Sequence, residues 1–258
     1  MRLPITLRDA ICSNEMETIC AELTAHPDTN LEQLDACLVL AMPQGNEEII
    51  KLLLQLGAQL DHESTRAAIE REDASILQLL VESGWDMNTT KYGRTPLHNA
   101  LYHQVSLRWL LSHGANPNIK SQSYTPGGTK SSHTPMSEAA ELSDPTPLLI
   151  LLSHGATLDP EAIFHAIGIR RSDNGIATLT TLIANGADVN FFSKRWLTPL
   201  YRAVYVNDET KLRLLLAHGA DATFQTGARK LTPLAFARNR KNEKLAAILE
   251  GAERQGKT

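Results

Sequence analysis

The sequence has few aromatic residues, few cysteines, no long hydrophobic run and no large excess of either charge. Phe, Trp and Tyr make up 5% of its 258 residues, although 42% of the residues are hydrophobic. Because no stretch approaches about 18 consecutive apolar residues, we expect no transmembrane helix. The apolar share and the small charge together exclude a disordered chain.

Charge and cysteine content narrow the expected environment. Lys and Arg number 25 against 29 Asp and Glu, a net charge of −4, so nucleic acid is not the expected partner. Cys12, Cys20 and Cys37 have no CxxC spacing, which is typical of reduced thiols without a disulfide or a thiolate metal site. The chain starts with early charges (Arg8, Asp9) rather than an apolar signal stretch. We therefore expect a cytoplasmic location, with the nucleus as an alternative, and no membrane attachment.

Two short phrases recur along the chain and organise it. The first begins with Thr-Pro and is found at Thr95-Pro96-Leu97-His98-Asn99-Ala100, Thr134-Pro135-Met136, Thr198-Pro199-Leu200-Tyr201-Arg202-Ala203 and Thr232-Pro233-Leu234-Ala235-Phe236-Ala237. The second is Gly-Ala, at Gly57, Gly114, Gly155, Gly186 and Gly219. With Gly84 included, these glycines are 27, 30, 41, 31 and 33 residues apart. Such a period indicates an array of stacked structural repeats.

These phrases resemble the ankyrin repeat, whose T-P-L-H-x-A signature recurs about every 33 residues. The resemblance covers nearly the whole chain and is strongest over 88–114 and 188–246. It implies an all-α solenoid of about eight stacked helix pairs. A loop, here called a finger, projects between successive pairs, and some fingers are short or degenerate.

Local chemistry agrees with that resemblance. The Thr95 hydroxyl suits a helix N-cap and Pro96 suits the first helical turn. Gly114 suits the left-handed residue that ends the second helix of a pair. Helices this short are not stable alone, so each pair must stack on its neighbours. Small residues such as Ala100 and Ala203 allow close stacking, which explains the low aromatic content.

The predicted architecture is a single ankyrin-repeat domain over 1–258. It consists of an N-terminal cap at 1–30, internal repeats at 31–231 with a long loop at 116–133, and a C-terminal cap at 232–258. The expected helix pairs are 6–26, 31–56, 63–83, 96–113, 135–154, 160–185, 199–218 and 233–251.

Departures from the repeat pattern are the best indicators of a binding site. The fingers after Gly57 and Gly155 are shortened, and the long loop 116–133 is extended. That loop is either a binding insertion or a tolerated flexible loop. The finger 190–197 carries three aromatics and two cations, and Trp196 stands where the ankyrin pattern has a glycine. These aromatics either form a recognition surface or pack on the neighbouring finger and cover a helix end.

The resemblance implies that partners bind the concave face and the finger tips. Carried onto this chain, the positions are Lys91, Tyr92, Arg94, Tyr102, His103, His133, Glu141, Lys194, Arg195, Leu197 and Tyr205. The aromatics of finger 190–197, Phe191, Phe192 and Trp196, are further partner-binding candidates. Their amphipathic, mixed character favours a protein partner over a polyanion. We therefore predict a non-enzymatic protein–protein interaction module without a cofactor. We expect a monomer, with self-association through the aromatics of finger 190–197 as an alternative.

The other open alternative is an unconventional enzyme or small-molecule binder. Tyr102, His103 and His133 could line a concave pocket under the long loop and perform acid–base chemistry such as an isomerisation or cyclisation. The sequence contains no HExxH, GxSxG or GxGxxG motif. His113, His154 and His218 recur with the repeat and so would not converge on an ion, and we predict no metal site.

Overall fold

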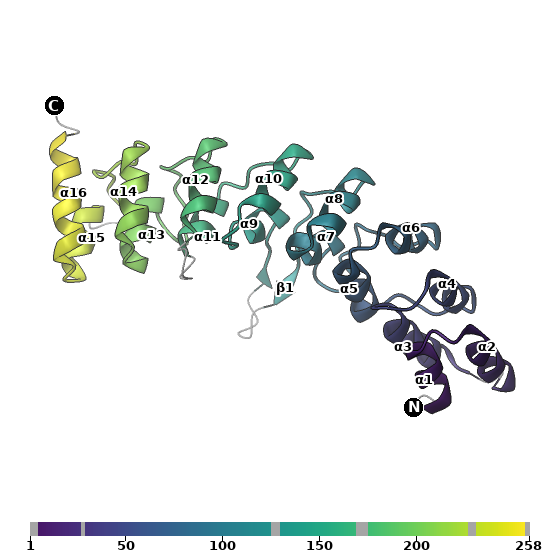
Figure 1. Cartoon of the computed structure of the whole chain (residues 1–258). Helices are drawn as coiled ribbons and strands as arrows, with labels where there is room; N and C mark the ends of the chain where they lie inside the picture. Colours follow the sequence, from purple (N-terminus) through teal and green to yellow (C-terminus); the bar gives the residue numbers. More distant parts are fainter. Residues whose placement is uncertain (1–4, 27–28, 125–129, 169–174, 227–230, 256–258) are drawn as a thin grey trace. The chain divides into compact units, whose positions relative to one another are not determined.

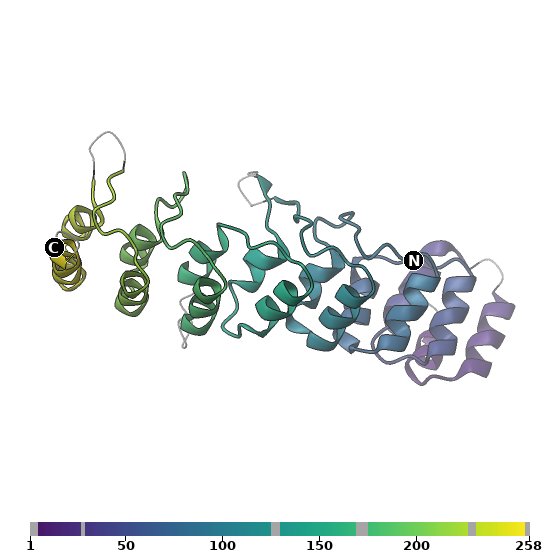
Figure 2. The same ribbon diagram turned by 90° about the horizontal axis from the view of Figure 1, so that it is seen from above.

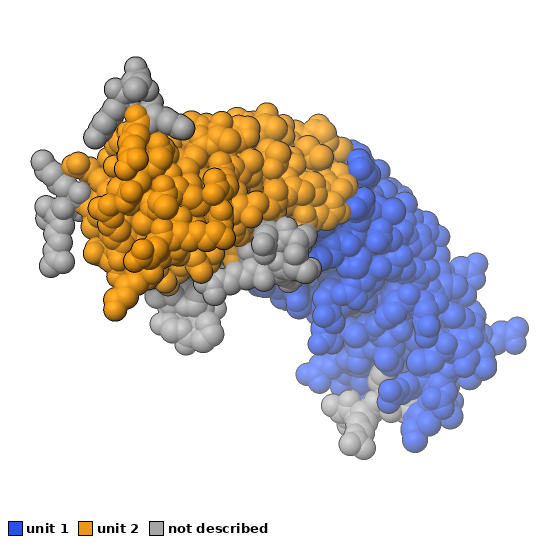
Figure 3. Space-filling view, turned by 60° about the vertical axis from the view of Figure 1, so that its left-hand side comes forward, with its two compact units in different colours: residues 1–132 blue, residues 133–258 orange. Residues whose placement is uncertain are grey.

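The computed structural model of the chain describes residues 5–26, 29–124, 130–168, 175–226 and 231–255 (Figure 1). It separates into two compact units, Met1–Ser132 and His133–Thr258, which are coloured separately in Figure 3. Both units consist of paired antiparallel helices, as expected for an all-α repeat solenoid.

Unit 1 contains the first four helix pairs and a small strand ladder. Its elements are α1 (Ile5–Cys12), α2 (Met16–Ala25), α3 (Leu31–Ala41), α4 (Glu47–Gln55), α5 (His62–Arg71), α6 (Ala74–Glu82), α7 (Pro96–Asn99), η1 (Ala100–Tyr102), α8 (Gln104–Ser112), β1 (Ser123–Tyr124) and β2 (Lys130–Ser131). The first helices α1, α3, α5 and α7 pack in series, and α4, α6 and α8 form a second layer. The antiparallel β1–β2 ladder lies in the long loop 116–133 and was not predicted.

Unit 2 repeats the same plan. Its elements are α9 (Pro135–Ala139), α10 (Thr146–Ser153), α11 (Ala162–Gly168), α12 (Ile176–Ala184), α13 (Pro199–Val206), α14 (Glu209–Ala217), α15 (Pro233–Asn239) and α16 (Glu243–Gln255). Here α9, α11, α13 and α15 pack in series, while α12, α14 and α16 form the outer layer. The finger that leads into α13 and the described part of the loop that leads into α15 project on the same side of the unit (Figure 2). The eight predicted helix pairs are thus all present.

The repeated phrases set the helix ends as the sequence predicts. Proline occupies the first turn of α7, α9, α13 and α15. Thr134 caps α9 by accepting the Ser137 N–H at 3.1 Å, whereas the Thr95 hydroxyl pairs with Nδ1 of His98 at 2.7 Å. At the end of α8, Gly114 has φ +99°, and the following N–H of Ala115 donates to Leu110 at 2.9 Å. That closure needs a left-handed residue, which glycine adopts without strain.

The core is aliphatic and contains the small residues that were expected to permit close stacking. Ala100, Ala139, Ala140 and Ala203 are fully buried, as are the leucines and isoleucines of the facing helices. Of the aromatics, Phe164 and Tyr201 lie in this core, exposed by 0% and 1%. Burial raises the pKa of the Tyr201 hydroxyl, which donates a hydrogen bond to the Leu231 carbonyl.

Buried donors on the second helices join successive repeats. Ser106, Thr178 and Lys211 are each fully buried and each stand eight residues before a phrase glycine. Ser106 donates to the Ile69 carbonyl at 2.7 Å, Thr178 to the Leu142 carbonyl at 2.6 Å and Lys211 to the Ile167 carbonyl at 2.9 Å. Each acceptor lies at or beyond the end of the preceding repeat's first helix, where carbonyls lack helical partners. We call these three residues the bridging donors.

Asparagines tie successive fingers together in the same periodic way. The Asn190 amide donates to the Gly219 carbonyl at 3.1 Å, and its oxygen accepts the Asp221 N–H at 2.7 Å. Asn88 makes the equivalent pair of bonds with Gly114 and Asn116 in unit 1. In each unit, one pair of neighbouring fingers is therefore held at a fixed spacing.

Candidate functional site

In unit 1, the predicted finger residues are partly engaged in packing. The Tyr92 hydroxyl donates to the Leu60 carbonyl at 2.9 Å, and its ring lies 5.8 Å from that of His62. The Lys91 ammonium lies 5.2 Å from the centre of the Tyr92 ring, and Arg94 donates to the His98 carbonyl at 3.4 Å. These contacts fix the finger on the preceding repeat and leave Lys91 exposed.

Tyr102 and His103 lie together at the end of η1, but they differ in environment. Tyr102 is 67% exposed, whereas His103 lies against Glu72, with its Nδ1 3.4 Å from the carboxylate. The same carboxylate accepts the backbone N–H of Val105 at 2.9 Å. Glu72 thus anchors the start of α8, and His103 is part of that anchor.

In unit 2, the finger 190–197 is closed by a tight backbone turn. Ser193 and Leu197 exchange both backbone hydrogen bonds, at 2.7 and 2.8 Å. The Ser193 hydroxyl donates to the Glu161 carboxylate at 2.9 Å. Leu197 has φ +67°, so a non-glycine residue here takes the left-handed conformation. In the finger that leads into α7, the corresponding turn uses Gly93, which has φ +81° and lies two residues before Thr95.

The aromatics of this finger mostly pack against neighbouring elements. Trp196 lies 5.3 Å from the Phe164 ring and 5.1 Å from His165, both on α11. Phe191 lies 6.3 Å from Phe164. Phe192 contacts Phe224 of the next loop at 5.8 Å and remains 46% exposed. This geometry favours the packing interpretation for Phe191 and Trp196, while Phe192 and the exposed Lys194 stay accessible.

Trp196 also begins a row in which arginine and aromatic side chains alternate. Two guanidinium groups lie near the Trp196 ring centre, that of Arg195 at 4.8 Å and that of Arg202 at 5.4 Å. Arg202 is 5.6 Å from the Tyr205 ring, and Arg240 is 5.1 Å from it. We call Arg195, Trp196, Arg202, Tyr205 and Arg240 the arginine–aromatic row. It follows finger 190–197, α13 and the end of α15.

The row presents positive charge on rigid supports. Arg195 and Arg240 are exposed, and among the residues described neither of them takes part in an ion pair. A guanidinium stacked on an aromatic face keeps its N–H edge free for hydrogen bonding, and that edge matches a carboxylate in two-point geometry. Tyr205, 50% exposed, adds apolar surface between the charges.

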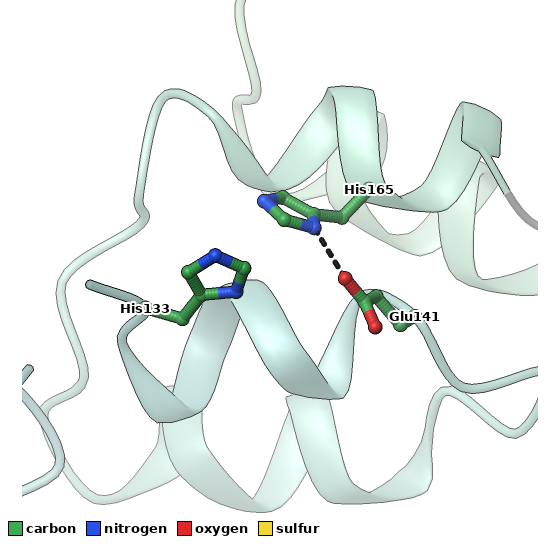
Figure 4. A group of neighbouring side chains, drawn as sticks. All are labelled: His133, Glu141 and His165. Carbon is green, nitrogen blue, oxygen red and sulfur yellow. Dashed lines mark hydrogen bonds and ion pairs between the residues drawn. The ribbon is translucent and has the colours of Figure 1, made fainter. Parts of the chain in front are cut away.

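A second cluster in unit 2 joins His133, Glu141 and His165 (Figure 4). Nδ1 of His165 donates to the Glu141 carboxylate at 2.6 Å, and the His133 and His165 rings meet edge-on with their centres 5.0 Å apart. Burial, and next the charge of His165, hold the pKa of His133 below its usual value. The imidazole of His133 is therefore neutral at pH 7.

The histidines considered for acid–base chemistry are described in separate units. His103 pairs with Glu72 in unit 1, and His133 lies with Glu141 and His165 in unit 2. The structure has an open hollow of about 630 Å³ between α4, α6 and the finger ending at Tyr92, and another of about 840 Å³ between α14 and α16. Neither is lined by Tyr102, His103 or His133. Residues 125–129 of the long loop lie outside the described residues.

Sequence reasoning missed Arg202, Arg240 and His165. Arg202 is the fifth residue of the Thr-Pro phrase that begins at Thr198. The phrase that begins at Thr95 has the neutral Asn99 at the same position. That contrast between aligned repeats was an available signal. Arg240 and His165 stand outside both repeated phrases, so only the packing of α11, α13 and α15 reveals them.

Comparisons with known proteins agree with this architecture. The family described as "Ankyrin repeats (3 copies)" matches residues 65–162. "Ankyrin repeat and KH domain-containing protein mask-1" of Caenorhabditis elegans is 23% identical over 244 residues, which is 90% of this chain and 8% of that protein. "Ankyrin repeat and SOCS box protein 11" of Danio rerio is 35% identical over 107 residues, 39% of this chain and 34% of that protein. The chain therefore matches only a minor part of the length of these relatives.

A solved structure shows the same fold. The crystal structure of the human ASB11 ankyrin repeat domain has a TM-score of 0.61 and 21% identity, and the match covers 82% of this chain and 96% of that one. Residues 65–162 thus match the ankyrin-repeat family, and the chain has the fold of an ankyrin-repeat domain. Ankyrin repeats are protein–protein interaction modules, built as stacked repeats with an extended binding surface. No helix among the described residues has the length and apolar character needed to cross a membrane.

Proposed function

We propose that this chain binds a protein partner through the arginine–aromatic row of unit 2, and that the bound segment of the partner carries Asp or Glu residues beside an apolar side chain. The observation that carries this proposal is the row itself, which alternates three guanidinium groups with the rings of Trp196 and Tyr205. Arginine and large aromatics dominate the energetics of protein interfaces. Finger 190–197 contributes Phe192, Lys194 and Leu197 at the edge of this surface.

The support of the row by packed elements favours binding without a large ordering cost. Trp196 is fixed by Phe164 and His165, and finger 190–197 is closed by the Ser193–Leu197 bonds and anchored to Glu161. Rigid side chains lose little freedom when a partner binds. The predicted residues of unit 1, Lys91, Tyr92, Arg94, Tyr102 and His103, are proposed as a second contact area.

A randomised peptide library selected on the purified chain tests this function. We expect the selected peptides to be enriched in Asp and Glu. Arg195→Ala and Arg240→Ala should each lower the affinity for these peptides about tenfold, because each removes a charge-assisted carboxylate contact. Arg213→Ala is the matched control, since Arg213 pairs with Glu209 at 2.9 Å on the second helix α14. Peptides without acidic enrichment, or equal losses in all three variants, would contradict the proposal.

Two competing explanations are outcomes of the same experiment. A single-stranded oligonucleotide that competes as well as the peptides would indicate recognition of polyanions, because such binding is electrostatic and falls with salt. Association of the chain with itself through the exposed Phe192 would appear as a concentration-dependent mass in light scattering, lost in Phe192→Ser.

We propose a monomer in the cytoplasm or the nucleus, and the free thiols of Cys12, Cys20 and Cys37 are consistent with a reducing compartment.

A further inference from the structure

The cluster of His133, Glu141 and His165 joins two successive repeats of unit 2 (Figure 4). His133 immediately precedes the Thr-Pro phrase that starts α9, Glu141 follows the end of α9, and His165 lies within α11. Because α9 and α11 pack together, one potential ligand atom from each residue lies within 4.8 Å of the other two. No metal site was predicted from the sequence, where His133 was grouped with Tyr102 and His103 and not with His165.

We propose that these three side chains form a binding site for a divalent transition-metal ion such as Zn²⁺. Two imidazoles and one carboxylate are nitrogen and oxygen ligands that suit zinc and its first-row neighbours, whereas Mg²⁺ and Ca²⁺ prefer oxygen alone. Three protein ligands leave a fourth position open to water or to a donor atom from a partner. The site adjoins the arginine–aromatic row, because Trp196 packs on His165, but the proposal does not rest on the proposed function of that row.

The histidines are held in a ligand-competent state. The His165 side chain is 9% exposed, and its ring is fixed edge-on between His133 and Trp196, at 5.0 and 5.1 Å. This packing positions both imidazoles beside each other, so the pair requires little reorganisation to bind an ion.

The remaining adjustment falls on the more exposed partner of His165. In the absence of an ion, Nδ1 of His165 and the Glu141 carboxylate share a hydrogen at 2.6 Å. Ligand atoms about 2.05 Å from a tetrahedral zinc ion stand about 3.3 Å apart, so this pair must widen by about 0.7 Å. Glu141 is 53% exposed and can rotate by that amount. The ion then replaces the shared hydrogen, and His165 carries its proton on Nε2.

Charges around the cluster make a specific prediction about affinity. Asp159 is near enough to favour positive charge at His133, whereas Arg195 opposes it. An arginine beside a cation site repels the ion, so Arg195→Gln should raise the affinity for metal. A gain in affinity on loss of this charge would place the bound ion near Arg195, whereas an ion bound at a distant surface group would not respond to that change.

Zinc titration against a chromophoric chelator tests the site directly. The chain carries no polyhistidine tag and has Cys12→Ser and Cys20→Ser, because both thiols are exposed and bind zinc themselves. We expect one ion per chain, and a loss of affinity of about tenfold or more in Glu141→Gln and in His165→Gln. The control is His103→Gln, since His103 also pairs with a carboxylate, Glu72 at 3.4 Å, but belongs to no three-residue cluster of potential ligands among the described residues.

Cobalt provides an independent readout of the ligand set. Co²⁺ bound by the cluster should show visible absorption bands that disappear in Glu141→Gln and persist in His103→Gln. Should His165→Gln fail to fold, the exposed Glu141→Gln keeps the test decisive. The proposal is overturned if no site tighter than about 100 µM exists, or if Glu141→Gln and His103→Gln bind zinc equally.

Discussion

The bridging donor Thr178 offers the sharpest test of how neighbouring repeats hold each other. Its hydroxyl is fully buried on α12 and donates to the Leu142 carbonyl at 2.6 Å, just beyond α9. Thr178→Val keeps the side-chain shape but removes the donor. The Leu142 carbonyl then stays buried without that partner, which costs about 1–3 kcal/mol.

The size of the unit converts this cost into a temperature shift. Unit 2 spans 126 residues, counted from His133–Thr258. With an unfolding entropy of about 2.1 cal/mol/K per residue, 1–3 kcal/mol lowers the midpoint by about 4–11 °C if unit 2 unfolds as one. The shift is about half as large if both units unfold together.

Thr181→Val on the same helix is the matched control. The Thr181 hydroxyl also bonds a carbonyl, that of Ala177 at 2.8 Å, but within its own helix. The Ala177 carbonyl retains its helical partner, so the change should stay within about 0.5 kcal/mol. Thermal unfolding followed by circular dichroism measures both variants. Equal midpoints for the two, or an unchanged midpoint in Thr178→Val, would refute the argument.

Three further predictions concern buried or paired groups. Lys211→Met should destabilise the chain by about 2–4 kcal/mol in urea unfolding, because it removes a fully buried donor and leaves Asp208 without its ammonium partner at 3.5 Å. Burial raises the pKa of the Cys37 thiol to about 11, so a thiol reagent at pH 8 should modify only the two exposed cysteines until denaturant is added. The Ser75 hydrogen bonds, supported by Arg71, lower the pKa of Asp73 below its usual 3.8. The Asp73 carboxylate therefore stabilises the fold above pH 3.8, and this stabilisation is lost as the pH falls through the folded-state pKa. The stability difference between wild type and Asp73→Asn should accordingly shrink below about pH 4.

These predictions have outcomes that would count against the contacts behind them. A Lys211→Met variant as stable as wild type would mean that the buried ammonium contributes nothing net, and Arg213→Met, exposed on the same helix, is its control. Rapid reaction of a third thiol in the native chain would show that Cys37 is accessible. A stability difference for Asp73→Asn that does not change with pH would show that the charge of Asp73 contributes nothing to stability.

The sequence predicted the repeats because their ends are specified locally. The Thr-Pro phrase at Thr198 and the glycine at Gly186 carry their own conformational preferences, so periodic copies locate the helix pairs without knowledge of packing. The bridging donors show the opposite case. Ser106, Thr178 and Lys211 occupy one position of the repeat, yet they differ so much in chemistry that no sequence pattern marks them.

The candidate sites were predictable only where the sequence itself departs from the pattern. The aromatics of finger 190–197 were found in that way, but their partners were not: Trp196 is held by Phe164 and His165, which lie in another repeat. The metal cluster likewise depends on α11 packing against α9. Contacts between repeats come from the stacking geometry, which the sequence of one repeat does not specify.

The central claim is that a partner binds along the arginine–aromatic row, and site-specific photocrosslinking tests it most directly. A photoreactive phenylalanine derivative is placed at Tyr205, which is 50% exposed within the row, or at Leu149, which is 46% exposed on α10 of the same unit. With an acidic peptide selected on the wild-type chain, we predict a crosslink from position 205 and none from position 149. Crosslinking from position 149 alone, or equally from both positions, would contradict the account.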